Sequence, residues 1–290
     1  MAVALSVVLG IVVSGCGGDD DVADETDGIR VAAFDFAESE LLAEIYAQAL
    51  EEHSVRVVRL GSIGPREIVS PALQQGAIDV VPEYLGTAAA HYGADAQDLT
   101  SLRVALADLG LTALDPAAAR DMNVFVVTER TAREHDLVRL GDLAAFAPGA
   151  TFGGPVECPD RPLCLAGLRE TYGIEFAEFV PQRSLARTAD ALRRGEIDVG
   201  LLFSTSAELA GDGLVVLVDD RRLQPLENVV PLVRVDALDR WGSAVRTALD
   251  SVSSALTTAG LRDLNARVEA GETVERVAAS WLATISADAL

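Results

Sequence analysis

An eight-residue segment that occurs twice is the feature that most constrains how this chain can fold. Residues 73–80 read LQQGAIDV and residues 192–199 read LRRGEIDV, with five of the eight positions identical. In each copy the glycine can end a helix in the left-handed conformation, and the apolar run after it is typical of a buried strand. A chance recurrence in an α/β protein is the alternative. A repeated helix, glycine and strand predicts two similar α/β lobes.

The residues that follow the two strands are candidates for a binding site. At the same spacing Tyr84 corresponds to Phe203, and Thr87 corresponds to Ser206. In open α/β sheets, ligands bind at the carboxyl ends of the strands. Each lobe would therefore present an aromatic ring and a hydroxyl at a strand end, which predicts a ligand cleft between the lobes.

Strands and helices are expected to alternate in the first part of the chain. The predicted strands cover residues 29–36, 55–60 and 78–81, and the predicted helices cover residues 38–53 and the segment that begins near Pro65. Glu38 and Glu40 suit the positive end of the first helix dipole. Pro71 could kink the second helix or mark its true start. A β-α-β-α-β order implies a parallel sheet with right-handed crossovers.

The same order returns later in the chain. Residues 95–120 are expected to form helix and loop, and residues 123–128 a strand that makes the first crossing between lobes. A short helix is expected at 140–146, strands at 150–153, 176–180 and 197–203, and helices at 165–172 and 185–194. Residues 214–218 and 229–235 are predicted strands that return to the first lobe, and the segment from residue 238 to the end is predicted to be helical.

The predicted fold class is therefore α/β with two lobes, each a mixed, mainly parallel sheet flanked by helices. The first lobe is expected to contain residues 29–120 and 214–290, and the second lobe residues 121–213, with two crossings between them.

The start of the chain has the pattern of an export signal. Residues 1–15 are apolar but too short to span a bilayer as an ordinary helix, and they suit the core of a signal peptide. Val13-Ser14-Gly15-Cys16 resembles the lipobox of bacterial lipoproteins, in which the cysteine becomes the lipidated first residue. No basic residue precedes the apolar run, unlike most signal peptides. We predict a signal peptide over residues 1–16, a lipid anchor at Cys16 on the extracytoplasmic face of the cell membrane, and a flexible acidic tether over residues 17–28.

Two further cysteines, Cys158 and Cys164, lie in the proline-rich segment ECPDRPLC. In an exported protein, two remaining cysteines in one loop are expected to form a disulfide. A metal site is not expected, because no histidine lies nearby and two thiolates are too few for structural zinc.

The charge of the chain limits the class of partner. The formal net charge is −22, which argues against nucleic acid, because affinity for nucleic acid depends on cationic contacts with phosphates. Acidity of this size also serves solubility alone.

Four segments together resemble the substrate-binding proteins of glycine betaine, choline and carnitine ABC transporters. They are FDFAESELLAEIYAQALEE, GPREIVSPALQQGAIDVVPEYLGTA, GGPVECPDRPLCLAGLRETYGI and LRRGEIDVGLLFST. The resemblance extends from residue 29 to residue 282. It implies a type II periplasmic-binding-protein fold that closes around a small ligand. It also implies that the partner of this protein is a membrane permease, which pairs with a cytoplasmic ATPase. The protein itself is expected to be a monomer.

The resemblance also implies which residues contact the ligand. The family surrounds a quaternary ammonium with tyrosines, and cation–π attraction contributes about 0.5–2 kcal/mol for each well-placed ring. Tyr84 matches the first of these tyrosines, and Thr87 matches the hydroxyl beside it. Asp121 matches a polar position at the crossing strand, and Phe203 stands near the third tyrosine without its hydroxyl.

Other positions depart from the family pattern. Asn123 stands where the second tyrosine is usual, and Glu227 stands where a Pro-Pro-Tyr-Asn pattern supplies the fourth. Phe34 occupies a position that is often basic or polar. The predicted site therefore has up to three rings, Phe34, Tyr84 and Phe203, and an added acid.

The altered positions leave the ligand open. A carboxylate can replace a ring as the partner of a cation, so a choline-like ligand remains possible. A zwitterionic betaine needs donors for its carboxylate, and Arg161 in the cysteine loop is the candidate. A sulfur-containing betaine, a larger aromatic compound or a polar amine are alternatives.

The sequence is compatible with three classes of function: a lipid-anchored binding protein for an ABC importer, a module that senses a ligand, and an enzyme on the same scaffold. The chain has no Gly-x-Ser-x-Gly motif, paired histidine motif or phosphate loop. We therefore expect a binding protein without catalysis, cofactor or metal.

Overall fold

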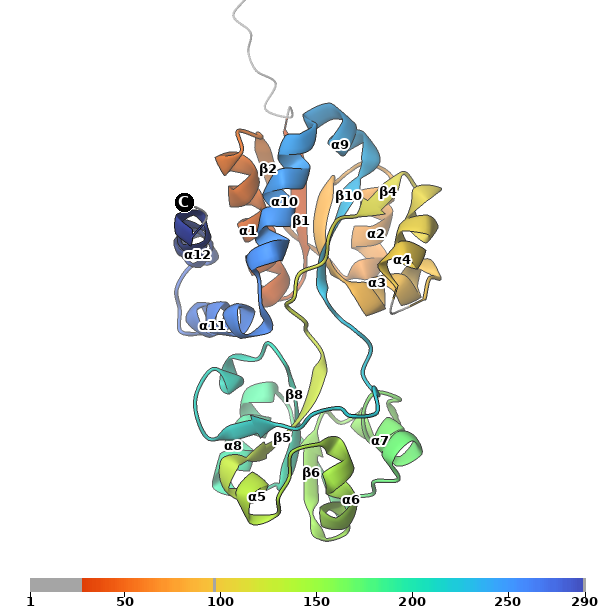
Figure 1. Cartoon of the computed structure of the whole chain (residues 1–290), viewed down its shortest axis with the longest axis vertical. Coiled ribbons are helices and arrows are strands. Elements are labelled where there is room, and N and C mark those ends of the chain that lie inside the picture. Colours follow the sequence, from red (N-terminus) through yellow and green to blue (C-terminus); the bar gives the residue numbers. More distant parts are fainter. Residues whose placement is uncertain (1–27, 96–97, 289–290) are drawn as a thin grey trace, which may run out of the picture.

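The computed structural model describes residues 28–95 and 98–288, which form two lobes joined by two crossing segments (Figure 1). Each lobe contains a five-stranded sheet with helices on both faces. The predicted signal peptide, the lipidated Cys16 and nearly all of the tether lie outside the described residues. Among the described residues, no helix is long and apolar enough to cross a membrane.

The sheet of the first lobe has the strand order β2-β1-β3-β10-β4. β1 pairs in parallel with β2 and β3, whereas β10 runs antiparallel to β3 and β4. The strands are β1 (Ile29–Phe34), β2 (Val57–Gly64), β3 (Val80–Tyr84), β4 (Leu111–Ala113) and β10 (Val229–Arg234).

Helices cover both faces of this sheet. On one face α1 packs against α10 and α12, and its buried Tyr46 belongs to the largest apolar cluster. On the other face α2, α3 and α4 bury a second cluster (Figure 1). The helices of this lobe are α1 (Ala37–Glu52), α2 (Arg66–Gln74), α3 (Leu85–Tyr92), α4 (Leu99–Ala107), α9 (Val235–Trp241), α10 (Ser243–Ala255), α11 (Thr258–Glu269) and α12 (Val274–Asp288).

The second lobe repeats this arrangement with the strand order β7-β6-β8-β5-β9. β6 pairs in parallel with β7 and β8, and β5 runs antiparallel to β8 and β9. The strands are β5 (Asn123–Thr128), β6 (Thr151–Gly154), β7 (Glu178–Pro181), β8 (Val199–Phe203) and β9 (Leu214–Val216). The α-helices are α5 (Glu129–Glu134), α6 (Leu143–Phe146), α7 (Leu165–Tyr172) and α8 (Leu185–Arg194). The 3-10 helices are η1 (Leu140–Asp142), η2 (Ala147–Gly149), η3 (Cys158–Asp160) and η4 (Ala207–Leu209).

The repeated sequence occupies equivalent places in the two sheets. Its copies lead into β3 and β8, each of which lies third in its sheet. The aspartate of each copy fixes the start of the neighbouring strand. Asp79 accepts the N–H of Arg30 at 2.9 Å, and Asp198 accepts the N–H of Thr151 at 2.8 Å. The two aspartates are therefore structural.

The two crossing segments are paired with each other through their backbones. Arg120 and Asn228 form an antiparallel bridge, and the N–H of Val229 donates to the carbonyl of Ala119 at 2.9 Å. Figure 1 shows both segments passing between the lobes and separating as they approach the second lobe. The chain therefore has a double connection at the cleft.

The predicted boundary of the second lobe at residue 213 is wrong. We expected residues 214–218 to return to the first lobe, but β9 pairs with β5 in the second sheet. The return crossing lies between β9 and β10 instead. An apolar segment of three residues satisfies its backbone groups at either sheet edge, so its sequence does not specify which lobe it joins.

The other differences concern the ends of elements. β4 is a strand within a segment expected to contain only helix and loop. Pro65 is the N-cap of α2, and Pro71 lies inside that helix. Cys158 and Cys164 form a disulfide with their Cα atoms 5.3 Å apart.

Helix α11 lies at the end of the first lobe that faces the second lobe (Figure 1). The guanidinium of Arg262 donates to the carbonyl of Ser204 at 2.9 and 3.1 Å. Ser204 follows β8, so α11 links the strand end of one lobe to the helices of the other.

Candidate functional site

A cleft of about 510 Å³ lies between the lobes at the carboxyl ends of β3 and β8. Its lining comes from both lobes, from the two crossing segments and from α11. This is the position at which open α/β sheets bind ligands. Its volume is within the range typical of small-molecule sites.

Three aromatic rings line the cleft. Phe36 lies between β1 and α1, Tyr84 ends β3, and Phe203 ends β8. The ring centroids of Phe36 and Tyr84 are 6.2 Å apart. Phe36 is 42% exposed and Phe203 is 41% exposed, although the chain buries most of its large apolar side chains. Exposed rings that face one cleft from two lobes are positioned for a ligand rather than for the core.

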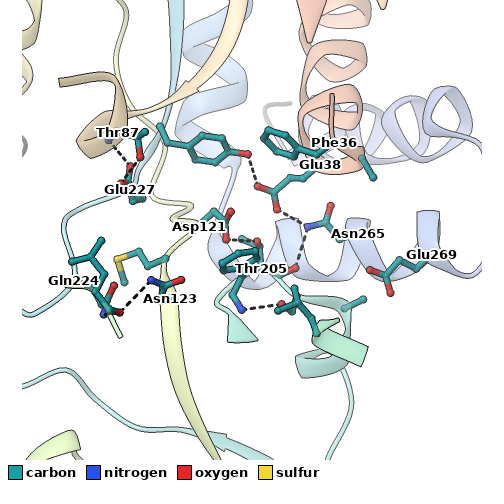
Figure 2. A pocket seen from close by; sticks show the side chains of 18 of the residues that line it. Phe36, Glu38, Thr87, Asp121, Asn123, Thr205, Gln224, Glu227, Asn265 and Glu269 are labelled. Carbon is teal, nitrogen blue, oxygen red and sulfur yellow. Dashed lines mark hydrogen bonds between the residues drawn. The ribbon is translucent and has the colours of Figure 1, made fainter. Parts of the chain in front are cut away.

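A polar network holds the hydroxyl of Tyr84, and Figure 2 shows its members Glu38, Asn265 and Thr205. This hydroxyl donates to Glu38 Oε1 at 2.6 Å, and Asn265 Nδ2 donates to Glu38 Oε2 at 2.6 Å. Asn265 also donates to the carbonyl of Thr205 at 3.0 Å, which joins the network to the second lobe. Burial, followed by the nearby Glu38 carboxylate, raises the pKa of Tyr84 well above its usual value, so its hydroxyl stays protonated.

An ion pair between Arg66 and Glu83 holds the backbone of Tyr84. Arg66 donates to both oxygens of Glu83, at 2.8 and 2.9 Å, and Glu83 also accepts the N–H of Tyr84 at 3.0 Å. Glu83 is buried, and the guanidinium of Arg66 lies 5.1 Å from the centroid of the Phe34 ring. This bidentate pair positions the tyrosine but does not line the cleft.

Glu227 connects the return crossing to the first turn of α3. Its carboxylate accepts the N–H of Thr87 at 2.9 Å and the hydroxyl of Thr87 at 2.7 Å. Gly86 makes this possible, because a Cβ at Gly86 would lie 3.0 Å from Glu227 Oε1. Burial raises the pKa of Glu227, and the bonds from Thr87 oppose that shift. Because Thr87 lies in the first turn of α3, the carboxylate of Glu227 faces the positive end of this helix.

Asp121 lies on the other crossing. The hydroxyl of Thr205 donates to its Oδ1 at 2.9 Å, and Oδ2 receives no hydrogen bond from any residue that the structure describes. Burial raises the pKa of Asp121 to about 7, and the charges of Glu38 and Glu227 act in the same direction.

The cleft is strongly acidic. Glu38, Asp121, Glu227 and Glu269 line it, and no arginine, lysine or histidine in residues 28–95 and 98–288 does so. Figure 2 shows the four carboxylates on different walls. Glu38, Asp121 and Glu227 are at least partly buried, and buried carboxylates that pair with no basic side chain favour a positively charged ligand.

The structure brings six of the eight sequence-predicted residues together in the cleft. They are Tyr84, Thr87, Asp121, Asn123, Phe203 and Glu227. Asn123 donates to the carbonyl of Leu163 at 3.4 Å. Their contact with a ligand stays a prediction.

Phe34 and Arg161 do not line the cleft. Phe34 is 3% exposed and packs with Ala32 in the cluster covered by α2 and α4, because side chains alternate along β1. Arg161 is exposed on the second lobe and pairs with Glu157 at 2.9 Å. The structure thus places both side chains outside the cleft lining.

Sequence reasoning missed several lining residues. Phe36 lies two positions after the predicted Phe34, beyond the carboxyl end of β1, and the rule that ligands bind at such strand ends could have identified it. Glu38 was assigned only to the helix dipole. Asn265 carried no signal, because its place depends on how α11 approaches the second lobe.

Comparison with known families gives one match over most of the chain. The model described as the substrate binding domain of ABC-type glycine betaine transport systems matches residues 27–284. The glycine-betaine-binding protein of Pseudomonas aeruginosa is 27% identical and covers 89% of this chain and 88% of its own. The glycine betaine-binding protein YehZ of Escherichia coli is 25% identical, with 88% and 89% covered.

Solved structures agree on the fold. A glycine betaine/carnitine/choline ABC transporter structure superposes with a TM-score of 0.81 at 21% identity, covering 88% of this chain and 98% of the other. The ligand-free YehZ of Escherichia coli superposes with a TM-score of 0.76 at 23% identity, covering 89% and 98%. The two-lobed, type II architecture predicted from the sequence is thus confirmed.

Proposed function

Because this chain belongs to the family of substrate-binding domains of ABC-type glycine betaine transport systems, we propose that it binds a small quaternary ammonium solute in the cleft between its lobes. It delivers this solute to the permease of an ABC importer. The similar proteins of Pseudomonas aeruginosa and Escherichia coli are named as glycine betaine-binding proteins, and one of Listeria monocytogenes as a carnitine transport binding protein.

The observation that carries the proposal is the combination of exposed rings and carboxylates in one cleft. Phe36, Tyr84 and Phe203 offer π faces, and Asp121 offers negative charge within the same cavity. A quaternary ammonium cannot donate a conventional N–H hydrogen bond, so its recognition depends on aromatic faces and on charge. Movement of the lobes about the two crossings would exclude water and bring rings of both lobes onto one ligand.

Further features support a position outside the cytoplasm. Substrate-binding proteins of ABC importers work on the extracytoplasmic side of the membrane, and the disulfide of Cys158 and Cys164 suits an oxidising compartment. We propose that Cys16 carries a lipid anchor and that the protein acts as a monomer without catalysis. Loss of membrane association in Cys16→Ala would support the anchor, and membrane association that survives this change would contradict it.

Calorimetric titration of the purified protein with choline, glycine betaine and carnitine tests the ligand class. Binding of at least one of them, with the resulting thermal stabilisation, is the expected result. A ligand at 100 times its dissociation constant adds about 2.7 kcal/mol to the free energy of unfolding. Absence of heat and of stabilisation with all three would refute the proposal. Uptake of the bound solute in cells with and without the gene would then test delivery.

A further inference from the structure

We propose that this cleft selects a net-cationic quaternary ammonium, such as the amino alcohol choline, over zwitterions that carry a carboxylate, such as glycine betaine. The inference rests on the proposed function, because it narrows the ligand class of the same site. It differs from what the names of the similar Pseudomonas and Escherichia coli proteins say of those proteins.

The first argument is the charge of the lining. Glu38, Asp121, Glu227 and Glu269 all face the cleft. Within the described part of the chain, no ion pair joins any of these four carboxylates to a basic side chain. A carboxylate on the ligand would be repelled by these four carboxylates. This repulsion would lower the binding free energy by an amount that decreases only with distance and screening.

The second argument is that no guanidinium of the described residues lines the cleft, and that three arginines close to it are engaged elsewhere. Arg66 binds both oxygens of Glu83, Arg161 pairs with Glu157, and Arg262 donates to the carbonyl of Ser204. Each of these guanidiniums lies outside the cleft lining. Bidentate arginine is the usual partner for a ligand carboxylate, and no such fork is available here.

The third argument is the use of the neutral donors. The hydroxyls of Tyr84, Thr87 and Thr205 donate to Glu38, Glu227 and Asp121 respectively. Both N–H groups of Asn265 are used, one by Glu38 and one by the carbonyl of Thr205. A ligand carboxylate that took these donors would leave protein acids unsatisfied. The neutral side-chain donors that remain in the described lining are Asn123 and Gln224, which donate to the carbonyl of Leu163, and the hydroxyl of Ser206.

Asp121 is the group best placed to balance the ligand charge. It lies on a crossing between Glu227 and the end of β8, and its Oδ2 receives no hydrogen bond from the described residues. The carboxylates of Glu38 and Glu227 each have both oxygens bonded, and Glu269 is exposed to solvent, which screens its charge. A trimethylammonium held by the rings would therefore meet Asp121 as its counter-charge, while the hydroxyl of choline can donate to an acid of the wall.

The test is a calorimetric comparison of choline, glycine betaine and the neutral choline isostere 3,3-dimethylbutan-1-ol, at about pH 8, above the pKa of about 7 of Asp121. We expect choline to bind at least about tenfold tighter than glycine betaine, a difference of about 1.4 kcal/mol. The isostere is expected to bind more weakly than choline by a similar factor. Glycine betaine that binds as tightly as choline, or tighter, would overturn the inference and leave the proposed function intact. Absence of binding by both quaternary ammonium compounds would remove the proposed function and the inference together.

Asp121→Asn adds a second measurement. It is expected to lower the affinity for choline more than that for glycine betaine, so that the ratio of the two dissociation constants narrows. Asp108→Asn, an equal charge change at an exposed position after α4, serves as the control and should keep the wild-type ratio. An unchanged ratio in Asp121→Asn would contradict the role of Asp121, and the wild-type comparison still decides the ligand class if this variant does not fold.

Discussion

The backbone N–H of Asp121 donates to the carbonyl of Glu227 at 3.0 Å, so the two crossing segments are hydrogen-bonded at the positions that carry their carboxylates. The side chains of both residues line the cleft (Figure 2). The connection between the lobes and the acidic part of the site are therefore the same structure. Any movement of one crossing relative to the other changes the distance between two negative charges.

This arrangement predicts that stability depends on pH through Asp121. Burial and the neighbouring acids raise its pKa from 3.8 to about 7 in the folded protein. The folded state then binds more protons than the unfolded state between those values, so the free energy of unfolding decreases as pH rises from about 4 to about 7. Chemical denaturation of the ligand-free protein at several pH values measures this slope. Asp121→Asn should flatten it, and an equal slope in wild type and variant would contradict the assignment.

Ligand affinity is expected to increase as pH rises, whereas the free energy of unfolding decreases. A cation favours the ionised form of Asp121, so binding releases a proton and affinity falls as pH drops below about 7. The limiting slope for one proton is about tenfold per pH unit. Titrations in buffers of different ionisation enthalpy count the released proton directly. Proton release that persists in Asp121→Asn would point to another acid, with Glu227 as the next candidate because burial raises its pKa as well.

Changing the two phenylalanines that flank Asp35 to alanine should affect different properties: ligand binding for Phe36 and the free energy of unfolding for Phe34. Phe36→Ala removes a ring that is 42% exposed in the cleft, so we expect binding to weaken by about 0.5–2 kcal/mol. Phe34→Ala empties a buried site, so we expect a loss of about 3–5 kcal/mol in the free energy of unfolding. Denaturation and calorimetry on both variants measure these effects. A Phe34→Ala variant that is stable but does not bind would restore Phe34 as the ligand contact.

The sequence identified the lobes and the strand ends because those features are local. A glycine after a helix and an apolar run define β3 and β8 wherever the rest of the chain lies, and α7 and α8 have the predicted bounds. The position of Asn265 in the cleft and the pairing of β9 with β5 depend on contacts between segments that are distant in the sequence. The hydrophobic periodicity of a single segment does not encode such contacts. Phe34 was chosen because the resemblance places a site residue at that position, whereas β1 ends at Phe34 and the ring that lines the cleft, Phe36, lies beyond the strand end.

Arg161 provides a test of the corrected site. The sequence favoured it as the partner of a ligand carboxylate, but its side chain is 64% exposed and pairs with Glu157. Exposed pairs of this kind contribute less than about 1 kcal/mol. Arg161→Ala should therefore lower the free energy of unfolding by less than about 1 kcal/mol and leave the affinity for any quaternary ammonium unchanged. Arg133→Ala, which breaks a similarly exposed pair with Glu129, is the matched control. A large loss of glycine betaine binding in Arg161→Ala alone would place Arg161 on the ligand.

Gly86 should resist a substitution that normally stabilises a helix. Glycine to alanine inside a helix usually gains about 1 kcal/mol, and Gly86 lies in the first turn of α3. Its Cβ would lie 3.0 Å from Glu227 Oε1 and 3.1 Å from Pro225 Cβ, so the return crossing would have to move. We expect Gly86→Ala to lower the melting temperature and to weaken ligand binding together, because Thr87 would lose its bonds to Glu227. Gly149→Ala in η2, where a Cβ meets nothing within 4 Å, should leave binding unchanged. A Gly86→Ala protein with a raised melting temperature and full affinity would show that the contact between α3 and the crossing is not required for the site.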